Sequence, residues 1–472
     1  MSPATRFSTH HTLDHVITDL SPLPRHDLTA TAAERRAAGR VARSRAPRKG
    51  FGTWSEGNRG HDALTTILAQ NAIGDPTLVP LRHERMAVSP WDYYRGAAAF
   101  MAADLGSCPH SAIEVQLCGD AHVLKFGLWA TPERNLSFDL RDFDESLPGP
   151  CERDLQRLAA SLIVAGQASG IRPGRSRSAV EAAVAAQRDR MHKYARMPEL
   201  EISYDGIHVD GLLGYFEPAD RGGVAVHIEK KKRHRTHEGA HNRLTEMARG
   251  RPRITEEPPI RTTVDDDEQL DLVDELLAGY RQTLQGDRRH LFDRSTETDV
   301  VRQVIGVGSV GMRVYLVLLE GRSGCDPLFL QCKQAGPSVY EASTRPSIHD
   351  NHGARVVEGE RLVQSATDIF VGWTSFRGHD YYVRQFRDMK IIPTIQLIAP
   401  RLIKFAAACG GGLAWAHART GDPVAIDAYL ASSRGFTDAI VAFTGCYADQ
   451  NVRDHAQLVD VLASGSTEAE PD

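Results

Sequence analysis

The stretch at residues 115–158 constrains the fold of this chain more than any other segment. It opens with a short apolar run, V-Q-L, that is typical of a strand, and Gly119 then allows a sharp turn. The turn leaves Asp120 and His122 on an exposed loop. A carboxylate on a loop directly after a strand is placed to handle a hydroxyl proton.

A second alternating run follows at residues 136–140 and ends in the acidic residues Asp142, Asp144 and Glu145. Magnesium takes oxygen ligands and commonly sits on one or two carboxylates together with substrate phosphates. The short spacing between Asp120 and these carboxylates therefore indicates a site that handles a proton and a divalent metal together. The alternative is a polar hairpin whose aspartates cap turns and helices.

The two runs resemble the catalytic loop and metal strand of the protein-kinase-like superfamily, especially its aminoglycoside and small-molecule kinases. The pattern of those kinases is H-G-D-x-H-x-x-N, followed by a strand that ends I-D-F/W-[DE] and a helix that starts D-L-A. Here the segments read C-G-D-A-H-V-L-K, D-L-R-D-F-D-E and D-L-Q-R-L-A. The resemblance implies these roles: Asp120 as catalytic base, His122 as the second histidine, Asp142 with Asp144 as metal ligands, and Asp154 as a structural aspartate.

Two positions depart from the kinase pattern. Lys125 stands where those kinases have an asparagine that binds a second metal ion, and a charged lysine cannot ligate magnesium. Three interpretations stay open: one metal suffices, Lys125 supplies part of the charge neutralisation at the catalytic site, or the protein binds nucleotide without turnover. Cys118 replaces a histidine whose role is mainly supportive.

A second informative stretch, residues 301–340, contains a glycine-rich turn between two strand-like runs. The turn holds Gly306, Gly308, Ser309 and Gly311, and Lys333 ends a third strand-like run. Backbone N–H groups of a glycine turn can approach phosphates, and a lysine can hold phosphates as a point charge. A glycine hairpin alone is more often a simple tight turn. Followed by a strand lysine, it is similar to the nucleotide loop and strand lysine of kinases.

A kinase-like lysine needs a glutamate partner on a nearby helix. Glu341 lies close to Lys333 in sequence, whereas Glu358 lies in R-V-V-E-G-E-R-L, a better helix, and both stay open. In kinases the glycine loop precedes the catalytic loop, whereas here Asp120 and Asp142 come first. The two resemblances together imply lobes in permuted order, which is allowed because function depends on the assembled site.

Over nearly the whole chain, the sequence also resembles a bacterial family named only as domain of unknown function 2252. The match rests on R-M-A-V-S-P-W-D-Y-Y-R-G, C-G-D-A-H, D-F-D-E-S-L-P-G-P and Y-Y-V-R-Q-F-R-D-M-K. The family name implies no activity. The first of these motifs predicts a helix start, since serine is a good N-cap and proline suits the first turn. Arg95 in this motif either reaches toward the acidic loop or lies on a solvated face.

Size and charge limit the class of protein. With 472 residues the chain is long for one core, and a net charge of -5 gives no general attraction to nucleic acid. The cationic run at residues 229–237 is either a solvated face or a collector of anionic substrate, and it lacks the interleaved aromatic residues of a nucleic-acid site. No apolar run approaches the roughly 20 residues of a membrane helix. The seven cysteines lack a C-x-x-C pair, as expected of reduced thiols in the cytoplasm.

Together these features predict an α+β, protein-kinase-like fold of two lobes in permuted order. The expected parts are a basic N-terminal arm (1–60), a helix-rich lobe with the catalytic and metal motifs (61–295), a small antiparallel sheet lobe with the glycine loop and lysine (296–395), a helical C-terminal part (396–464) and a disordered tail (465–472). The expected function is an ATP- and magnesium-dependent phosphotransferase acting on a small-molecule hydroxyl or amine. The alternatives are a nucleotide-binding module without turnover and a metal-dependent hydrolase, which leaves the glycine turn and Lys333 without a role.

Overall fold

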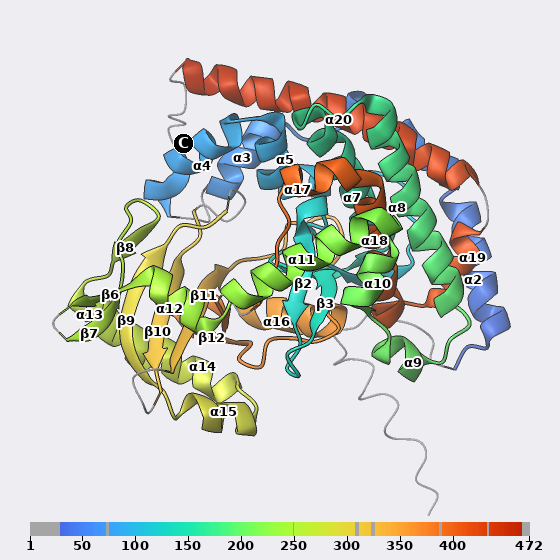
Figure 1. Cartoon of the computed structure of the whole chain (residues 1–472). Helices are drawn as coiled ribbons and strands as arrows, with labels where there is room; N and C mark the ends of the chain where they lie inside the picture. Colours follow the sequence, from blue (N-terminus) through green and yellow to red (C-terminus); the bar gives the residue numbers. More distant parts are fainter. Residues whose placement is uncertain are drawn as a thin grey trace, which may run out of the picture.

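The computed structural model describes residues 29–71, 75–248, 250–306, 311–321, 326–386, 389–431 and 434–464. It combines helices with antiparallel sheets, which confirms the predicted α+β class. Figure 1 shows the largest sheet on one side of the molecule and most of the long helices on the other. The first part of the predicted basic arm, 1–28, and the predicted disordered tail, 465–472, lie outside the described residues.

The largest sheet has six antiparallel strands in the order β12-β13-β11-β10-β9-β8. The strands are β8 Arg261–Thr263, β9 Thr296–Gln303, β10 Val314–Glu320, β11 Pro327–Ala335, β12 Gly372–Phe376 and β13 His379–Gln385. Strand β11 is buried along its whole length, because its alternating side chains enter apolar cores on both faces of the sheet. Lys333 lies near the end of this central strand, opposite Val314 on β10 and Tyr382 on β13.

Short helices cover both faces of this sheet. They are α12 His237–Leu244, α13 Asp266–Asp271, α14 Ala278–Thr283, α15 Gly286–Phe292 and α16 His352–Val363, and a small hairpin of β6 Thr245–Ala248 and β7 Arg251–Ile254 follows α12. Tyr280 of α14 shares one core with Val317, whereas Leu244 of α12 packs near Phe329 on the other face. The segment 240–292 precedes the lobe border expected at residue 295, yet it packs on the sheet.

The helical part surrounds one large core. Its N-terminal helices are α2 Ala32–Arg45, α3 Ala63–Asn71, α4 Val79–Ala87, α5 Pro90–Gly96 and α6 Ala98–Gly106. Its middle helices are α7 Glu152–Ala168, α8 Pro173–Tyr194, α9 Glu199–Tyr204, α10 Val209–Gly214 and α11 Pro218–His234. Its C-terminal helices are α17 Ile395–Ile398, α18 Leu402–Thr420, α19 Pro423–Leu430 and α20 Arg434–Ala463. Ser89 caps α5 and Pro90 occupies its first turn, as the sequence predicts.

Two further small sheets complete the fold, and Figure 1 shows β2 and β3 of one of them between the large sheet and the helices. Strand β1 Glu114–Leu117 pairs with β4 Leu147–Pro150, and β2 Phe126–Ala130 pairs with β3 Leu136–Leu140, which also meets β5 Ile207–His208. The segment that leaves β13 joins this layer, because Leu128 and Ile391 exchange backbone hydrogen bonds of 3.0 and 2.9 Å. The large sheet is therefore tied to the strand that follows the Asp120 loop.

The described part of the N-terminal segment is docked on the C-terminal helices. Phe51 lies edge-on to Phe436 of α20, and Trp54 is packed against Tyr447 of the same helix. Helix α2 packs on α19 so closely that a Cβ on Gly39 would lie 2.2 Å from the Ala425 carbonyl oxygen. Residues 32–54 are therefore anchored on the C-terminal helices through a few buried residues, while most side chains of α2 stay exposed.

Helix α18 is largely buried in this core, and it crosses α8 at close range. A Cβ on Gly410 would lie 2.0 Å from the Ala183 carbonyl oxygen. Gly410→Ala is therefore expected to lower the free energy of unfolding by about 1–3 kcal/mol or more, because the two backbones must separate. Urea unfolding measures this loss. Gly445→Ala in α20 has open space around the new methyl group and should be neutral or stabilising, and equal effects of the two substitutions would contradict the close crossing.

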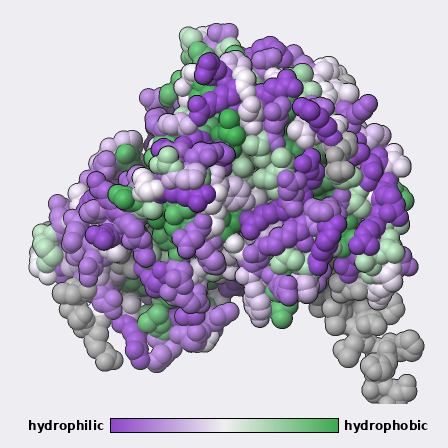
Figure 2. Space-filling model, turned by 45° about the vertical axis from the view of Figure 1, so that its right-hand side comes forward, coloured by the Kyte–Doolittle hydropathy of each residue, from purple (hydrophilic) through white to green (hydrophobic). Residues whose placement is uncertain are grey.

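Residues Ile395–Thr420 form a helical segment that is long and apolar enough to cross a membrane, which the sequence analysis does not anticipate. Of its most apolar window, 61% is buried inside the structure, where α18 packs against α8. On the face of the molecule shown in Figure 2, hydrophobic residues form small areas separated by hydrophilic ones. The apolar side chains of this segment therefore pack mainly in the core of the fold.

Candidate active site

A polar cleft of about 190 Å³ lies where the large sheet meets the small sheets and the N-terminal helices. Its charged lining consists of Arg95, Asp120, Lys125, Arg141, Asp142, Asp144, Glu145, Lys333 and Arg384, together with His122. The acidic loop and the strand lysine that the sequence singles out therefore line one cleft.

Asp154 supports the Asp120 loop through two hydrogen bonds to its backbone. The Asp154 carboxylate at the start of α7 accepts hydrogen bonds from the backbone N–H groups of Cys118 and Gly119, at 2.8 and 2.9 Å. Gly119 has φ of 86°, and a Cβ there would lie 2.3 Å from the Glu145 carbonyl oxygen, so the loop requires glycine. These contacts give Asp154 the loop-supporting position expected of it.

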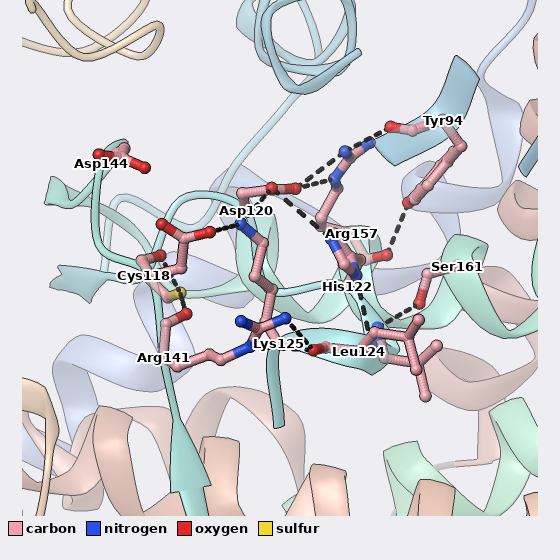
Figure 3. A network of polar contacts seen from close by, with 12 residues as sticks. Tyr94, Cys118, Asp120, His122, Leu124, Lys125, Arg141, Asp144, Arg157 and Ser161 are labelled. Atoms are coloured by element: carbon pink, nitrogen blue, oxygen red, sulfur yellow. Dashed lines mark hydrogen bonds and ion pairs between the residues drawn. The ribbon is translucent and has the colours of Figure 1, made fainter. Parts of the chain in front are cut away.

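Asp120 is buried between two cations (Figure 3). The Arg157 Nε atom donates to its Oδ1 atom at 2.9 Å, and the Lys125 Nζ atom lies 3.0 Å from its Oδ2 atom. Burial alone would raise the pKa of Asp120, but Lys125 and Arg157 outweigh burial and lower the pKa to about 2. Asp120 is thus a carboxylate at any physiological pH.

Tyr94 fixes the Arg157 guanidinium from the opposite side. The Arg157 Nη2 atom donates to the Tyr94 carbonyl oxygen at 2.7 Å, and the Tyr94 hydroxyl donates to the Arg157 carbonyl oxygen at 2.7 Å. The guanidinium carbon also lies 3.9 Å from the centre of the Tyr94 ring. Figure 3 shows how this pair aims Arg157 at Asp120.

Lys125 bridges two of the predicted site carboxylates. Its Nζ atom lies 2.5 Å from Asp142 Oδ2 as well as 3.0 Å from Asp120 Oδ2. Asp142 itself has φ of 68°, an uncommon conformation that a short polar side chain tolerates. At the position where kinases carry a metal-binding asparagine, this chain therefore places a cation between the proposed base and the proposed metal ligand.

Lys333 reaches the same carboxylates from the large sheet. Its Nζ atom forms an ion pair with Asp144, 189 residues away in the sequence, and lies 3.6 Å from Asp142 Oδ1. The lysine side chain is only 2% exposed. Burial alone would lower the pKa of Lys333, but the charges of Asp144 and Asp142 raise it, so the lysine is an ammonium group.

The two candidate glutamate partners of Lys333 have other roles. Glu341 accepts a hydrogen bond from the Ser338 N–H at 3.0 Å, and Glu358 pairs with Arg361 at 2.9 Å. The side chain that α16 directs at the site is Arg355, which donates to the carbonyl oxygens of Asp144 and Ser146 at 2.6 and 2.7 Å. The expected lysine–glutamate pair is therefore replaced by lysine–aspartate pairs, with an arginine supporting the acidic loop.

His122 is neutral and held in place. Its Nδ1 atom accepts a hydrogen bond from the Leu124 N–H at 3.3 Å, and its Nε2 atom lies 3.8 Å from Asp120 Oδ2. The Trp91 ring meets the imidazole edge-on. Burial, despite the opposing charge of Asp120, holds the pKa of His122 well below its ordinary value. His122 therefore shapes the loop around the base as an uncharged group.

The ends of the glycine turn reach the cleft mouth. Gly306 has φ of 61° and Gly311 has φ of 101°, conformations that favour glycine. The Arg85 guanidinium donates to the Gly306 carbonyl oxygen at 2.7 Å, and the Asp75 N–H donates to the Gly311 carbonyl oxygen at 2.6 Å. The N-terminal helices thus anchor the turn. Its other predicted phosphate-binding residues, Gly308 and Ser309, lie outside the described residues.

Asp142 and Asp144 can hold a magnesium ion as a pair. Asp142 Oδ1 and Asp144 Oδ1 are both buried without a hydrogen-bond partner, although Lys333 lies nearby. Over the residues that the structure describes, no cluster of three or more histidine, cysteine, aspartate or glutamate side chains is placed to hold a metal ion. Magnesium commonly binds to one or two protein carboxylates and takes its other oxygen ligands from substrate and water. Asp142 and Asp144 therefore fit this ion.

Comparison with known proteins places the chain in a family. A family model described as an uncharacterized protein conserved in bacteria, domain of unknown function 2252, matches residues 74–461. The chain belongs to this family. The matched range contains every residue of the cleft lining except Gln70, including Asp120, Asp142 and Lys333. No curated protein and no solved structure matches the chain significantly.

Several polar residues of this family domain were not singled out by the sequence analysis. Arg157 contacts Asp120 and Arg384 lines the cleft, although no local motif assigns either arginine a role. A signal for Arg157 is present: an arginine between Leu155 and Leu158 on an apolar stripe must find a buried partner. Arg355 offers a similar signal within α16.

Glu145 gives this family member a pH-dependent stability. Burial, reinforced by the neighbouring charges of Asp144 and Asp120, raises the pKa of Glu145 to about 7, although the Val339 N–H hydrogen bond opposes the shift. Because the folded-state pKa exceeds the ordinary value of 4.5, stability is fully present below pH 4.5 and is lost as pH rises through 7. Glu145→Gln is expected to raise the free energy of unfolding at pH 8 by up to about 3 kcal/mol relative to the native chain, with little difference at pH 4.5. Urea unfolding at both pH values measures this, and a pH-independent difference would contradict it.

Proposed function

We propose that this protein is an ATP- and magnesium-dependent phosphotransferase with a kinase-like active site, acting on a hydroxyl or amine of a small molecule. The observation that carries the proposal is the position of the Lys333 ammonium group, 3.6 Å from Asp142 Oδ1 and paired with Asp144. The sequence features that resemble a phosphate-binding lysine and a metal-binding strand are far apart in the chain and meet in one cleft. The order of glycine turn, lysine strand and helix α16 in the large sheet supports kinase-like lobes in permuted order.

In this proposal, Asp120 orients the acceptor hydroxyl and receives its proton. The acceptor oxygen forms a bond to the γ-phosphorus of ATP, the bond from that phosphorus to the β–γ bridging oxygen breaks, and ADP leaves with the bonding electrons. Because Lys125 and Arg157 hold Asp120 as a carboxylate, its role is to position the hydroxyl and to take the proton late in the transfer.

Lys333 would hold phosphate oxygens of ATP, leaving Asp144 and Asp142 for the metal. A magnesium ion on these carboxylates would supply charge neutralisation at the phosphates. Lys125 already neutralises part of Asp142 and Asp120, which favours a single metal ion over two. We place this activity in the cytoplasm, with a small-molecule acceptor and without a membrane or nucleic-acid partner.

A second candidate function is nucleotide binding without turnover. The observation that favours it is the position of Lys125, whose ammonium group pairs with both Asp120, the proposed base, and Asp142, a proposed metal ligand. In this alternative the acidic loop is locked, and the protein responds to nucleotide without transferring a phosphoryl group.

One experiment separates the two functions. Wild-type protein is assayed for ADP formation from ATP and magnesium against a panel of sugars, amino alcohols, hydroxy acids, sugar phosphates and aminoglycosides, while calorimetry measures binding of a nonhydrolysable ATP analogue. The proposed function predicts nucleotide binding and acceptor-dependent ADP formation. Nucleotide binding without acceptor turnover and without autophosphorylation supports the nucleotide-binding module. Absence of nucleotide binding overturns both the phosphotransferase and the module.

A further inference from the structure

Three arginines from three different elements line the cleft beside the proposed catalytic groups. Arg95 comes from α5, Arg141 follows β3, and Arg384 lies on β13. All three side chains are half-buried. The sequence does not predict that these three arginines converge. For Arg95 it allows either a position near the acidic loop or one on a solvated face, and the structure places Arg95 in the cleft.

These guanidinium groups have few partners. In the described part of the chain, Arg141 donates to the Leu124 carbonyl oxygen, at 3.2 Å from both Nε and Nη2. Arg384 makes a long hydrogen bond of 3.4 Å to Gln331 Oε1, and its guanidinium carbon lies 5.5 Å from the centre of the Tyr382 ring. Arg95 contacts Asp92 on its own helix at 3.2 Å. The Nε atoms of Arg95 and Arg384 are buried without a hydrogen-bond partner. Among the described residues, neither Arg141 nor Arg384 forms an ion pair with a carboxylate.

The carboxylates of the cleft are already paired with other cations. Asp120 is bound by Lys125 and Arg157, and Lys333 lies against Asp142 and Asp144. Over the residues that the structure describes, Arg95 pairs with Asp92, whereas no carboxylate forms a direct ion pair with Arg141 or Arg384. Burial alone would lower the pKa of Arg384, but Tyr382, Glu360 and Asp142 act on it and raise that pKa. Burial lowers the pKa of Arg141 and the neighbouring Asp142 opposes this shift, whereas Arg384 and Arg95 repel the Arg141 charge and lower its pKa further. An anionic ligand would relieve both the repulsion and the missing hydrogen bonds.

The position of Arg95 assigns it to the acceptor side of the cleft. It belongs to the same short helix as Tyr94, which aims Arg157 at Asp120. Its charge also contributes to the low pKa of His122, beside the proposed base. Arg384, by contrast, follows Tyr382, the cross-strand neighbour of Lys333, and so lies on the nucleotide side. Arg141 stands between them, next to Asp142.

We propose that the acceptor substrate carries an anionic group, a phosphate or a carboxylate, that Arg95 and Arg141 bind while Asp120 contacts its reacting hydroxyl. This assignment rests on the proposed function and narrows its substrate class. A polycationic acceptor such as an aminoglycoside would meet three arginines in the cleft and is disfavoured. The known chemistry of arginine forks with phosphate and carboxylate oxygens suits the role.

Inorganic phosphate serves as the first probe. Protein saturated with magnesium and a nonhydrolysable ATP analogue, so that the nucleotide phosphate site is filled, is titrated with phosphate by calorimetry. The native chain is expected to bind phosphate, Arg95→Gln to bind it at least tenfold more weakly, and Arg95→Lys to retain part of the affinity. Arg177→Gln, an exposed substitution on α8, is the matched control and should bind like the native chain. Absence of phosphate binding, or equal affinity in Arg95→Gln, overturns the assignment.

If the analogue itself does not bind, the proposed function fails, and the same titration of the free protein still tests the anion site. The second arm compares acceptors in matched pairs: glycerol with glycerol 3-phosphate, glucose with glucose 6-phosphate, and kanamycin as a polycation. The proposal predicts kcat/KM at least tenfold higher for the anionic member, and a rise in KM for that member in Arg95→Gln with a smaller change in kcat. Turnover confined to neutral or cationic acceptors leaves the phosphotransferase standing and overturns the anionic acceptor.

Discussion

Asp120→Asn is expected to lower kcat for phosphoryl transfer by about 10²- to 10⁴-fold, the range that a positioned acid or base contributes. The asparagine keeps the shape of the side chain, but its single amide oxygen can accept from only one of Arg157 and Lys125, and it cannot take the acceptor proton. Steady-state kinetics with an acceptor found by the panel measures the effect. Affinity for the nucleotide should change little, because in the proposed function Lys333 and the glycine turn, not Asp120, hold its phosphates.

A matched control for this substitution is Asp139→Asn. Asp139 is a buried aspartate of β3 that accepts hydrogen bonds from the Ser365 and Leu140 N–H groups, at 2.7 and 2.8 Å, and does not line the cleft. Asp139→Asn is expected to affect stability far more than kcat. If Asp120→Asn retains kcat within about threefold of the native chain, Asp120 is not the group that receives the proton.

Lys333→Met should weaken binding of magnesium–ATP by about 10- to 100-fold, since a hydrogen bond to a charged group contributes about 1.5–3 kcal/mol. The substitution also leaves Asp144 without its ammonium partner, and breaking a buried ion pair costs about 3–5 kcal/mol of stability. Binding is therefore measured by calorimetry at a temperature where circular dichroism shows the variant to be folded.

Lys404→Met provides the comparison for Lys333→Met. Lys404 pairs with Glu217 at 2.7 Å on the surface, far from the lining of the cleft, so its loss should leave nucleotide affinity unchanged. Nucleotide affinity of a folded Lys333→Met protein equal to that of Lys404→Met would show that the strand lysine does not hold phosphates.

Those residues of the candidate cleft that belong to short sequence motifs could be predicted from the sequence. A glycine followed by Asp120, and an alternating run that ends at Asp142, are short patterns whose chemistry can be recognised without knowing the fold. Lys333 could be predicted as a strand residue because its strand is apolar on both faces. Its meeting with Asp142 was inferred from a resemblance to kinases, since no local pattern encodes a contact between such distant segments.

The parts that could not be predicted depend on tertiary packing. The choice between Glu341 and Glu358 presumed a kinase-like pair, whereas Arg355 of α16 occupies the space beside the acidic loop. The helices before residue 295 join the sheet because Tyr280 and Phe292 have an apolar face to cover there, which their helical periodicity does not reveal. Likewise, the partners of Arg157 become visible only once α5 is folded over α7.

The central claim is that two distant segments build one nucleotide site, and a double-mutant cycle of nucleotide binding tests it most directly. Calorimetry with magnesium and a nonhydrolysable ATP analogue is carried out on the native chain, Lys333→Met, Asp142→Asn and the double variant. The account predicts that the native chain binds the analogue. It also predicts that the two substitutions are coupled, so that the fold-loss of affinity in the double variant is at least about tenfold smaller than the product of the fold-losses in the two single variants. Losses that simply multiply, or a native chain that does not bind the analogue, would contradict it.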